Sequence, residues 1–355
     1  MNLSFQASYR REGAMNILVV EEPFHFACGG QIPSVELAYE TWGELNADRS
    51  NAVLILTGLS PNAHAASSED DPFDGWWEPM IGPGKAIDTD QHFVVCVNSL
   101  GSCKGSTGPG CTNPVTGKQY RLSFPDLYIQ DIASSALMVL EYLGIEQLRA
   151  LVGPSMGGMS CLAALRQKPD IARHLLARST AARAEPFAIA VRSLLREMIV
   201  REPHWHDGAY TEDDWPETGM RLARKMGMIS YRSALEWRHR FTRQQIPENR
   251  RDHTPFAPQF EIESYLDAHA DRFVGGFDPN SYIYLSRAMD WFSVADNEAD
   301  TAAALAQLGF ESALVIAVET DILFPAYQQE TIRDGLKAGG TEVSYHLLAS
   351  VQGHD

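Results

Sequence analysis

The sequence has 355 residues, of which 45% are hydrophobic and 21% are charged, and its formal net charge is −17. A chain of this length and composition can bury a large core, as one domain with an insertion or as two domains. The acidic balance argues against a nucleic-acid partner and against an anionic membrane surface. No stretch approaches ~18 continuous apolar residues and the N-terminus lacks a signal-peptide pattern, so we expect a cytoplasmic protein without a membrane partner.

Apolar segments in the first half of the chain predict strands and one helix. Three segments alternate or run apolar and predict an antiparallel meander: residues 15–20, 24–28 and 34–43. Three more are continuously apolar, as in strands covered on both faces: residues 51–58, 92–99 and 148–153. Residues 126–144 place apolar side chains at helical spacing, and Gly144 provides a C-terminal stop.

In the second half of the chain, the alternation of strands and helices is interrupted by a helical region and then resumes. Between Glu185 and Asn297, tryptophan, proline and charged residues are frequent and the only regular patterns are helical, which indicates a helical lid. Alternation resumes with a helix at 299–308, a strand at 312–319, a helix at 325–338 and a strand at 343–350. We therefore predict an α/β fold with a mostly parallel central sheet, helices on both faces and a lid insertion. The predicted division is 1–184 and 298–355 for the core and 185–297 for the lid.

A G-x-S-x-G pattern marks the predicted junction between the strand at 148–153 and the helix that follows. Its members are Gly153, Ser155 and Gly157. In this motif a sharp turn raises the serine hydroxyl above the sheet edge, and glycines flank it because side chains would collide with neighbouring backbone. A glycine-rich connection that happens to hold a serine is the alternative, because five-residue patterns arise by chance.

An acid and a histidine occur where a serine nucleophile needs them. Asp321 directly follows the predicted strand at 312–319, and His354 follows the last predicted strand. Both lie past the carboxyl ends of strands, at the sheet edge where Ser155 is expected. The chain order Ser, Asp, His is that of α/β-hydrolases, which favours a catalytic role for Ser155, with His354 as base and Asp321 orienting it.

Acyl transfer through a serine also needs two backbone N–H donors for the oxyanion. We expect one from Met156, directly after the nucleophile, and the other from the loop after the strand at 51–58, near Leu56.

The histidines and cysteines give no pattern of metal ligands. His204 and His206 form a His-x-His pair within the predicted lid, but a metal site would need further ligands nearby, so no metal is expected. Cys96 and Cys161 fall in apolar elements, which is typical of buried thiols. Cys103 and Cys111 flank a glycine-rich loop and are able to come into contact, but nothing in the sequence requires it.

Long stretches of the chain are similar to the homoserine O-acyltransferase family of α/β-hydrolases, which transfer acyl groups from coenzyme A to an amino-acid hydroxyl. The resemblance covers nearly the whole chain and includes LAYETWGELNADRSNAVLILTG, GWWEPMIGPGKAIDTDQHFVVCVNSLGSCKGSTGP, VGPSMGGM, LARKMGMISYRS, YLSRAMDWF and GHD. It implies that Ser155 accepts the acyl group, that Arg224 holds the substrate carboxylate and that Asp355 holds its amine. It also implies a homodimer formed through the lid, with small-molecule substrates and no cofactor besides the acyl-CoA co-substrate.

Two departures from the family pattern bear on the substrate and on the C-terminus. The segment Leu59, Ser60, Pro61 and Asn62 stands beside the nucleophile and is similar to the branch that acylates serine with succinyl groups. A proline-braced loop there is able to shorten the acceptor pocket by about one methylene, a difference of only ~1–3 kcal/mol. Relatives continue past Asp355 through a further helix, so we expect either a truncated sequence or a poorly braced His354 loop.

A succinyl donor ends in a carboxylate and therefore needs a cation that an acetyl donor does not. Arg183, at the entrance to the predicted lid, is the candidate favoured by the resemblance, and an ordinary solvated arginine is the alternative.

The sequence thus predicts an L-serine O-succinyltransferase that works through an acyl-Ser155 intermediate in cysteine biosynthesis. Alternatives are a homoserine O-succinyltransferase or O-acetyltransferase in methionine biosynthesis, and a serine esterase with the same three residues. A non-catalytic protein that keeps the fold is a further alternative, although its expected sign, the loss of one of these residues, is not found.

Overall fold

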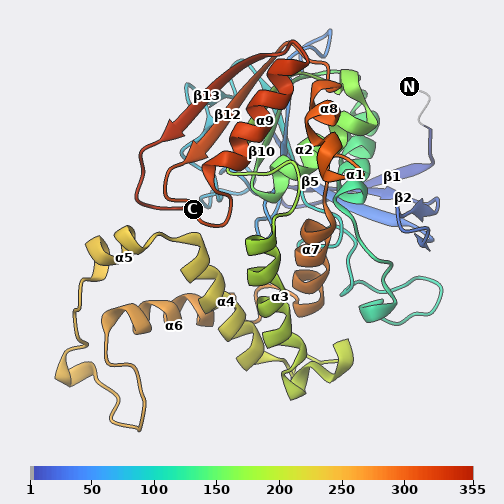
Figure 1. Ribbon diagram of the computed structural model, residues 1–355. Coiled ribbons are helices and arrows are strands. Elements are labelled where there is room, and N and C mark those ends of the chain that lie inside the picture. The colour runs from blue at the N-terminus through green and yellow to red at the C-terminus, as the bar shows by residue number, and fades with distance from the viewer. Residues whose placement is uncertain (1–3, 355) are drawn as a thin grey trace.

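A nine-stranded sheet forms the centre of the protein in a computed structural model, which describes residues 4–354 (Figure 1). In spatial order the strands are β1 (Ala7–Glu12), β2 (Met15–Val20), β5 (Val35–Trp42), β9 (Phe93–Val97), β6 (Ala52–Leu56), β10 (Leu148–Pro154), β11 (Ala172–Arg178), β12 (Ser312–Val318) and β13 (Glu342–Leu348). The first three are antiparallel, and β9 through β13 in this order are parallel. The prediction of a mostly parallel sheet with an antiparallel N-terminal part is confirmed.

Within residues 4–354 the helices of the core cover one face of this sheet, and no helix is found on the second face, where the prediction also expected helices. The covering helices are α1 (Ile129–Leu143), α2 (Met156–Gln167), α8 (Thr301–Ala306) and α9 (Ala326–Ala338) (Figure 1). On the opposite face, side chains such as Val53 and Cys96 pack against the segment 65–87, which carries only the short strands β7 (Ile81–Gly82) and β8 (Ile87–Asp88). This segment buries the apolar face without forming a helix among the described residues.

A second group of helices lies below the sheet in Figure 1, on the side where the C-terminus lies. They are α3 (Pro186–Val200), α4 (Glu217–Tyr231), α5 (Ala234–Phe241), α6 (Glu261–Phe273) and α7 (Pro279–Trp291). α3 packs against both α4 and α7, and α4 packs against α6. The helical content fits the predicted lid, whose exact limits as a domain remain a prediction. None of the helices within residues 4–354 is both long enough and apolar enough to cross a bilayer.

The second predicted strand of the meander, residues 24–28, does not join the main sheet. Its first two residues form β3 (Phe24–His25), which pairs with β4 (Gln31–Ile32) in a separate two-stranded sheet. The chain turns at Gly29, which has φ 90°, and the rings of Phe24 and Phe26 pack edge to face. The apolar alternation there reflects the packing of Phe24 and Phe26 in the main hydrophobic core rather than a place within the sheet.

All five cysteines are free thiols. Cys96 and Cys161 are fully buried, as predicted, and Cys103 and Cys111 are partly buried without forming a disulfide.

The turn between β10 and α2 passes so close to β6 that only glycine fits at position 157. A Cβ at Gly157 would lie 2.0 Å from the Leu56 carbonyl oxygen, whereas a Cβ at Gly309 would meet no atom within 4 Å. Because the obstacle is backbone of a central strand, it cannot move aside as a flexible side chain can.

We expect Gly157→Ala to lower the free energy of unfolding by about 1–3 kcal/mol, the cost of overpacking a close-packed region. Urea unfolding followed by circular dichroism measures this, with Gly309→Ala as the matched control that should behave like wild type. Equal stability of the two variants would contradict the close approach.

Candidate active site

Ser155 lies at the turn between β10 and α2 in a strained conformation. Its φ of 54° and ψ of −124° fall outside the regions that non-glycine residues ordinarily occupy. Its N–H donates to the Arg178 carbonyl at 2.9 Å, and its own carbonyl accepts from Thr180 Oγ1 at 2.7 Å. Because both partners lie at or just past the end of β11, the neighbouring strand holds the turn in place. The predicted strand–turn–helix at Ser155 is confirmed.

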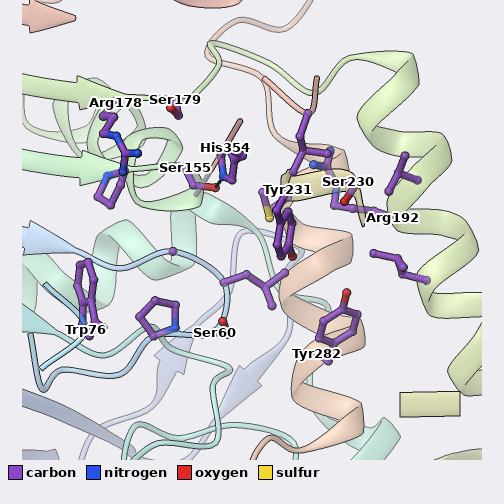
Figure 2. Close-up of a pocket in the computed structure, with 18 of the residues that line it drawn as sticks. Ser60, Trp76, Ser155, Arg178, Ser179, Arg192, Ser230, Tyr231, Tyr282 and His354 are labelled. Atoms are coloured by element: carbon purple, nitrogen blue, oxygen red, sulfur yellow. Dashed lines mark hydrogen bonds between the residues drawn. The ribbon is translucent and has the colours of Figure 1, made fainter. Parts of the chain in front are cut away.

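The structure brings Ser155, Asp321 and His354 into one chain of hydrogen bonds. His354 Nε2 lies 3.0 Å from Ser155 Oγ, and His354 Nδ1 lies 2.8 Å from Asp321 Oδ2. Asp321 is 3% exposed, and its Oδ1 accepts from the N–H groups of Leu323 at 2.9 Å and Phe324 at 2.8 Å. These bonds fix the carboxylate, which in turn orients the ring with Nε2 toward the serine (Figure 2).

The expectation of a poorly braced His354 loop is wrong, because the lid supports this loop. The His354 N–H donates to the Tyr231 carbonyl at 2.8 Å, and Ser233 Oγ donates to the Val351 carbonyl. Gly353 has φ 86°, and a Cβ there would lie 2.6 Å from the Tyr231 carbonyl oxygen. The base is therefore anchored at the junction between α4 and α5.

A cavity of about 430 Å³ opens beside Ser155 and His354 (Figure 2). The loop after β6 and the pair Trp76–Trp77 form part of its wall, and side chains of α3, α4 and α7 form the part contributed by the lid. Most of this lining is apolar, with a few polar groups, which is the composition of a pocket that binds and orients a small molecule.

Three of the four residues predicted to set substrate specificity border this cavity. Leu59, Ser60 and Pro61 line it, whereas Asn62 does not. The Asn62 carbonyl instead accepts from Trp76 Nε1 at 2.9 Å, so Asn62 supports the wall from behind.

The predicted oxyanion donors differ in how they lie relative to the cavity. Met156 is the first residue of α2, directly after Ser155. Leu56 is the last residue of β6, does not border the cavity and has its carbonyl close to Gly157. Gly58 and Leu59 border the cavity in its place. Residues of this loop therefore border the cavity two to three positions after Leu56, and the position of the second donor stays a prediction.

Arg192 lines the cavity, and the sequence analysis missed it. It projects from α3, is 4% exposed and pairs through Nε with Asp290 Oδ1 at 2.5 Å. The other oxygen of Asp290 pairs with Arg196 Nη2 at 2.6 Å. Nη1 and Nη2 of Arg192 are buried and have no hydrogen-bond partner within residues 4–354. Two cations thus share one carboxylate, which leaves one positive charge and the four N–H groups of Arg192 Nη1 and Nη2 beside the cavity (Figure 2).

A sequence signal for Arg192 exists in retrospect. It lies on the buried face of α3 with Ala188, Leu195 and Ile199, at helical spacing. A charged residue on an otherwise apolar helix face needs a buried partner or a ligand.

Arg183 does not face this cavity. Its Nε pairs with Glu185 at 2.9 Å and its Nη2 pairs with Glu298 at 2.6 Å. Hydrogen bonding to Glu298 outweighs partial burial and raises the pKa of Arg183 above its ordinary value. With two carboxylates in contact, Arg183 is poorly suited to bind a third, so the structure argues against the predicted role in donor choice.

Arg224 and Asp355 were predicted to hold the substrate amino acid. Arg224 lies on α4 with its guanidinium 4.7 Å from the centre of the Phe273 ring, and its buried Nε has no hydrogen-bond partner within the described chain. It does not itself border the cavity, but Tyr231, two turns later on the same helix, does. Asp355 lies outside the described residues.

The His204–His206 pair gains a third member in the structure. Asp214 Oδ2 lies 2.6 Å from His206 Nε2, and the other Asp214 oxygen contacts His204 Nδ1. Hydrogen bonds from His204 and then His206 lower the pKa of Asp214. The side chains are 44% to 59% exposed and lie away from the cavity, and their ligand atoms are close enough together to hold a metal ion.

Comparisons with known proteins agree with this geometry. Residues 51–345 match the family described as alpha/beta hydrolase fold. The chain is 56% identical to a serine O-succinyltransferase of Stenotrophomonas maltophilia (strain K279a), over 94% of this chain and 90% of that protein. A homoserine O-acetyltransferase from Bacillus anthracis superimposes with a TM-score of 0.87 at 28% identity, over 96% of this chain and 92% of that one. Esterase E22 superimposes with a TM-score of 0.84 at 28% identity, over 96% of this chain and 95% of that one.

The matched length and identity extend well beyond the residues around Ser155 and include both the sheet and the lid helices. The chain therefore belongs to the homoserine/serine O-acyltransferase family of α/β hydrolases.

Proposed function

We propose that this protein transfers a succinyl group from succinyl-CoA to the hydroxyl of L-serine and releases coenzyme A. The contact of His354 Nε2 with Ser155 Oγ beside a cavity that also holds the free donors of Arg192 is the observation that carries this proposal. The serine O-succinyltransferase name of a relative with 56% identity supports the same donor and acceptor. The product, O-succinyl-L-serine, would supply cysteine biosynthesis.

The reaction proceeds in two acyl transfers with balanced protons. Ser155 Oγ attacks the thioester carbonyl while His354 Nε2 takes its proton, and the same proton passes to the departing thiol of coenzyme A. The hydroxyl of the acceptor serine then attacks the Ser155 ester, His354 takes that proton and returns it to Ser155 Oγ. Asp321 keeps the ring oriented and stabilises its charged form in both steps.

Backbone N–H groups beside the nucleophile stabilise the negative charge on the carbonyl oxygen. We assign this role to Met156 and to the cavity-facing backbone at Gly58 or Leu59, in place of Leu56. Arg224 is the proposed partner of the acceptor carboxylate and Asp355 that of its amine, which would point the acceptor hydroxyl at the ester.

Hydrolysis by the same three residues is the competing function, since esterase E22 shares this fold with a TM-score of 0.84. A transferase differs from a hydrolase in that the hydroxyl of an acceptor, and not water, attacks the acyl-Ser155 ester. Homoserine as acceptor and acetyl-CoA as donor are the nearer alternatives, as the homoserine O-acetyltransferase neighbour indicates.

The proposal is tested by assaying succinyl-CoA and acetyl-CoA against serine, homoserine and water, with thiol release as the readout. We expect the highest kcat/KM for succinyl-CoA with serine and no turnover by Ser155→Ala. Thiol release that is independent of both amino acids would show a hydrolase, and a preference for homoserine would show the related transferase.

Arg192 is the residue that we propose to bind the distal carboxylate of the succinyl group. In Arg192→Met the kcat/KM for succinyl-CoA should fall about 30-fold or more, because removing one partner of a buried charge pair costs 2 kcal/mol or more. Activity with acetyl-CoA should change little. Arg183→Met is the control and should keep the donor preference. Loss of preference in the Arg183 variant alone would restore the role first predicted for that residue.

We further propose that the protein is a homodimer formed through the lid. Exposed apolar side chains gather on its helices: Phe187 and Leu194 on α3, Leu222 and Ile229 on α4, and Leu235 on α5. Such a group of exposed apolar residues is typical of a protein interface.

The double change Leu222→Asp with Ile229→Asp should yield a monomer in light scattering, because charges at an apolar interface remain unpaired. Val115→Asp, exposed outside the lid, is the control and should leave the mass unchanged. A wild-type protein that is already monomeric would contradict the interface.

A further inference from the structure

His64 lies behind the cavity wall and joins three separate segments of the chain. Its Nδ1 is 2.9 Å from Glu40 Oε2 on β5, and its Nε2 is 2.9 Å from the carbonyl oxygen of Phe73. The side chains of His64 and Glu40 are only 13% and 7% exposed, and Asp71 Oδ2 is 3.7 Å from the same Nδ1.

The partners of His64 constrain its protons. A backbone carbonyl oxygen can only accept, so Nε2 must carry a hydrogen. A neutral imidazole then has a bare Nδ1, and a second proton is needed to bond this nitrogen to the Glu40 oxygen. The pair therefore shares a bridging proton, and the nearby Asp71 favours its location on the ring, as an imidazolium facing a carboxylate.

The direction of both pKa shifts agrees with this arrangement. Burial disfavours the charged ring, but the hydrogen bonds to Glu40 and to the Phe73 carbonyl outweigh it, and the pKa of His64 lies above its ordinary value. Burial raises the pKa of Glu40, and the hydrogen bond from His64 offsets part of that rise. Glu40 and Asp71 are the charged groups that face the ring from the sheet and from the loop.

The segment that contains His64 supports the residues that border the cavity. The His64 carbonyl accepts from the Trp76 N–H at 3.3 Å, and the Ala65 carbonyl accepts from the Trp77 N–H at 2.9 Å. Asn62 accepts from the Trp76 indole at 2.9 Å. Hydrogen bonds therefore hold the two tryptophans against residues 62–65. The imidazole of His64 in turn attaches this segment to β5 of the central sheet through Glu40.

We propose that the proton bridge between His64 and Glu40 is a positioning device that fixes the wall formed by Ser60, Pro61, Trp76 and Trp77, and thereby sets the length of acceptor amino acid that fits. This inference rests on the proposed transfer to serine. A pocket discriminates between substrates that differ by one methylene by about 10–200-fold. This discrimination requires that the residues of the pocket wall keep their positions when the longer substrate binds. His64 and Glu40 act through the wall and do not touch the reacting atoms.

The test separates the two half-reactions in wild type, His64→Ala and His346→Ala. Thiol released in the first turnover without acceptor reports acylation, and kcat/KM for serine against homoserine reports acceptor choice. We expect His64→Ala to acylate at a rate within about twofold of wild type while its preference for serine falls roughly tenfold, within the range above. His346, exposed on β13, is the matched control and should change neither.

The outcomes distinguish this inference from the proposed function. Absence of acylation in wild type would overturn the proposed function itself. Normal acylation with unchanged acceptor preference in His64→Ala would overturn the inference alone, and so would an equal loss in both half-reactions.

A second measurement applies to the intact protein even if His64→Ala fails to fold. Nitrogen-15 NMR of the ring should show both nitrogens of His64 protonated up to a higher pH than in an ordinary histidine, and Glu40→Gln should lower the pKa of His64. Since the pKa of His64 is raised in the fold, the bridge is present at lower pH, and the serine preference should decline as pH rises through that pKa. A pKa of His64 that is the same in Glu40→Gln as in wild type, or a preference independent of pH, would refute the bridge.

Discussion

The hydrogen bond between His354 and Ser155 depends on three parts of the chain that meet only in the folded protein. The turn after β10 supplies the serine in a strained conformation, the segment after β12 supplies Asp321, and the lid holds the loop that carries His354. Because the Tyr231 carbonyl accepts from the His354 N–H, a shift of α4 would displace the base as well as the cavity wall. The lid is therefore part of the catalytic support, and substrate access and base position depend on the same helix junction.

Charge inside the cavity is opposite in sign to that of the whole protein. The net charge is −17, whereas the arginines Arg178 and Arg192 line the cavity, and behind Arg192 the group of Arg192, Arg196 and Asp290 holds two cations and one anion. A low-dielectric site strengthens the attraction of such a group for a carboxylate, and the ion pairs with Asp290 hold the two guanidinium groups in place. A succinyl group, with an apolar stem and a charged end, has the chemistry that this cavity accommodates.

The sequence predicted the parts of the fold that have a strong local pattern. The continuous apolar runs became β6, β9 and β10, and the serine motif gave the correct turn. β1, with its polar sequence and exposed side chains, had no apolar pattern to reveal it. The resemblance pointed to Arg183, but Glu185, two residues along the chain, and Glu298, 115 residues away, occupy its guanidinium, and only coordinates reveal the second pairing. The spacing along α3 marks Arg192 as a charge on a buried helix face, but its partner Asp290 and the His64–Glu40 pair depend on contacts between elements, which residue spacing does not encode.

The most direct test of the account is to trap the acyl group on the enzyme. Succinyl-CoA is mixed with wild type and with His354→Gln in the absence of any amino acid, and the digested proteins are analysed by mass spectrometry. The account predicts one added succinyl group on the peptide that contains Ser155 in wild type, removed when serine is added, and almost none in the variant. A succinyl group on another residue, or equal labelling of Ser155 without the imidazole, would contradict it.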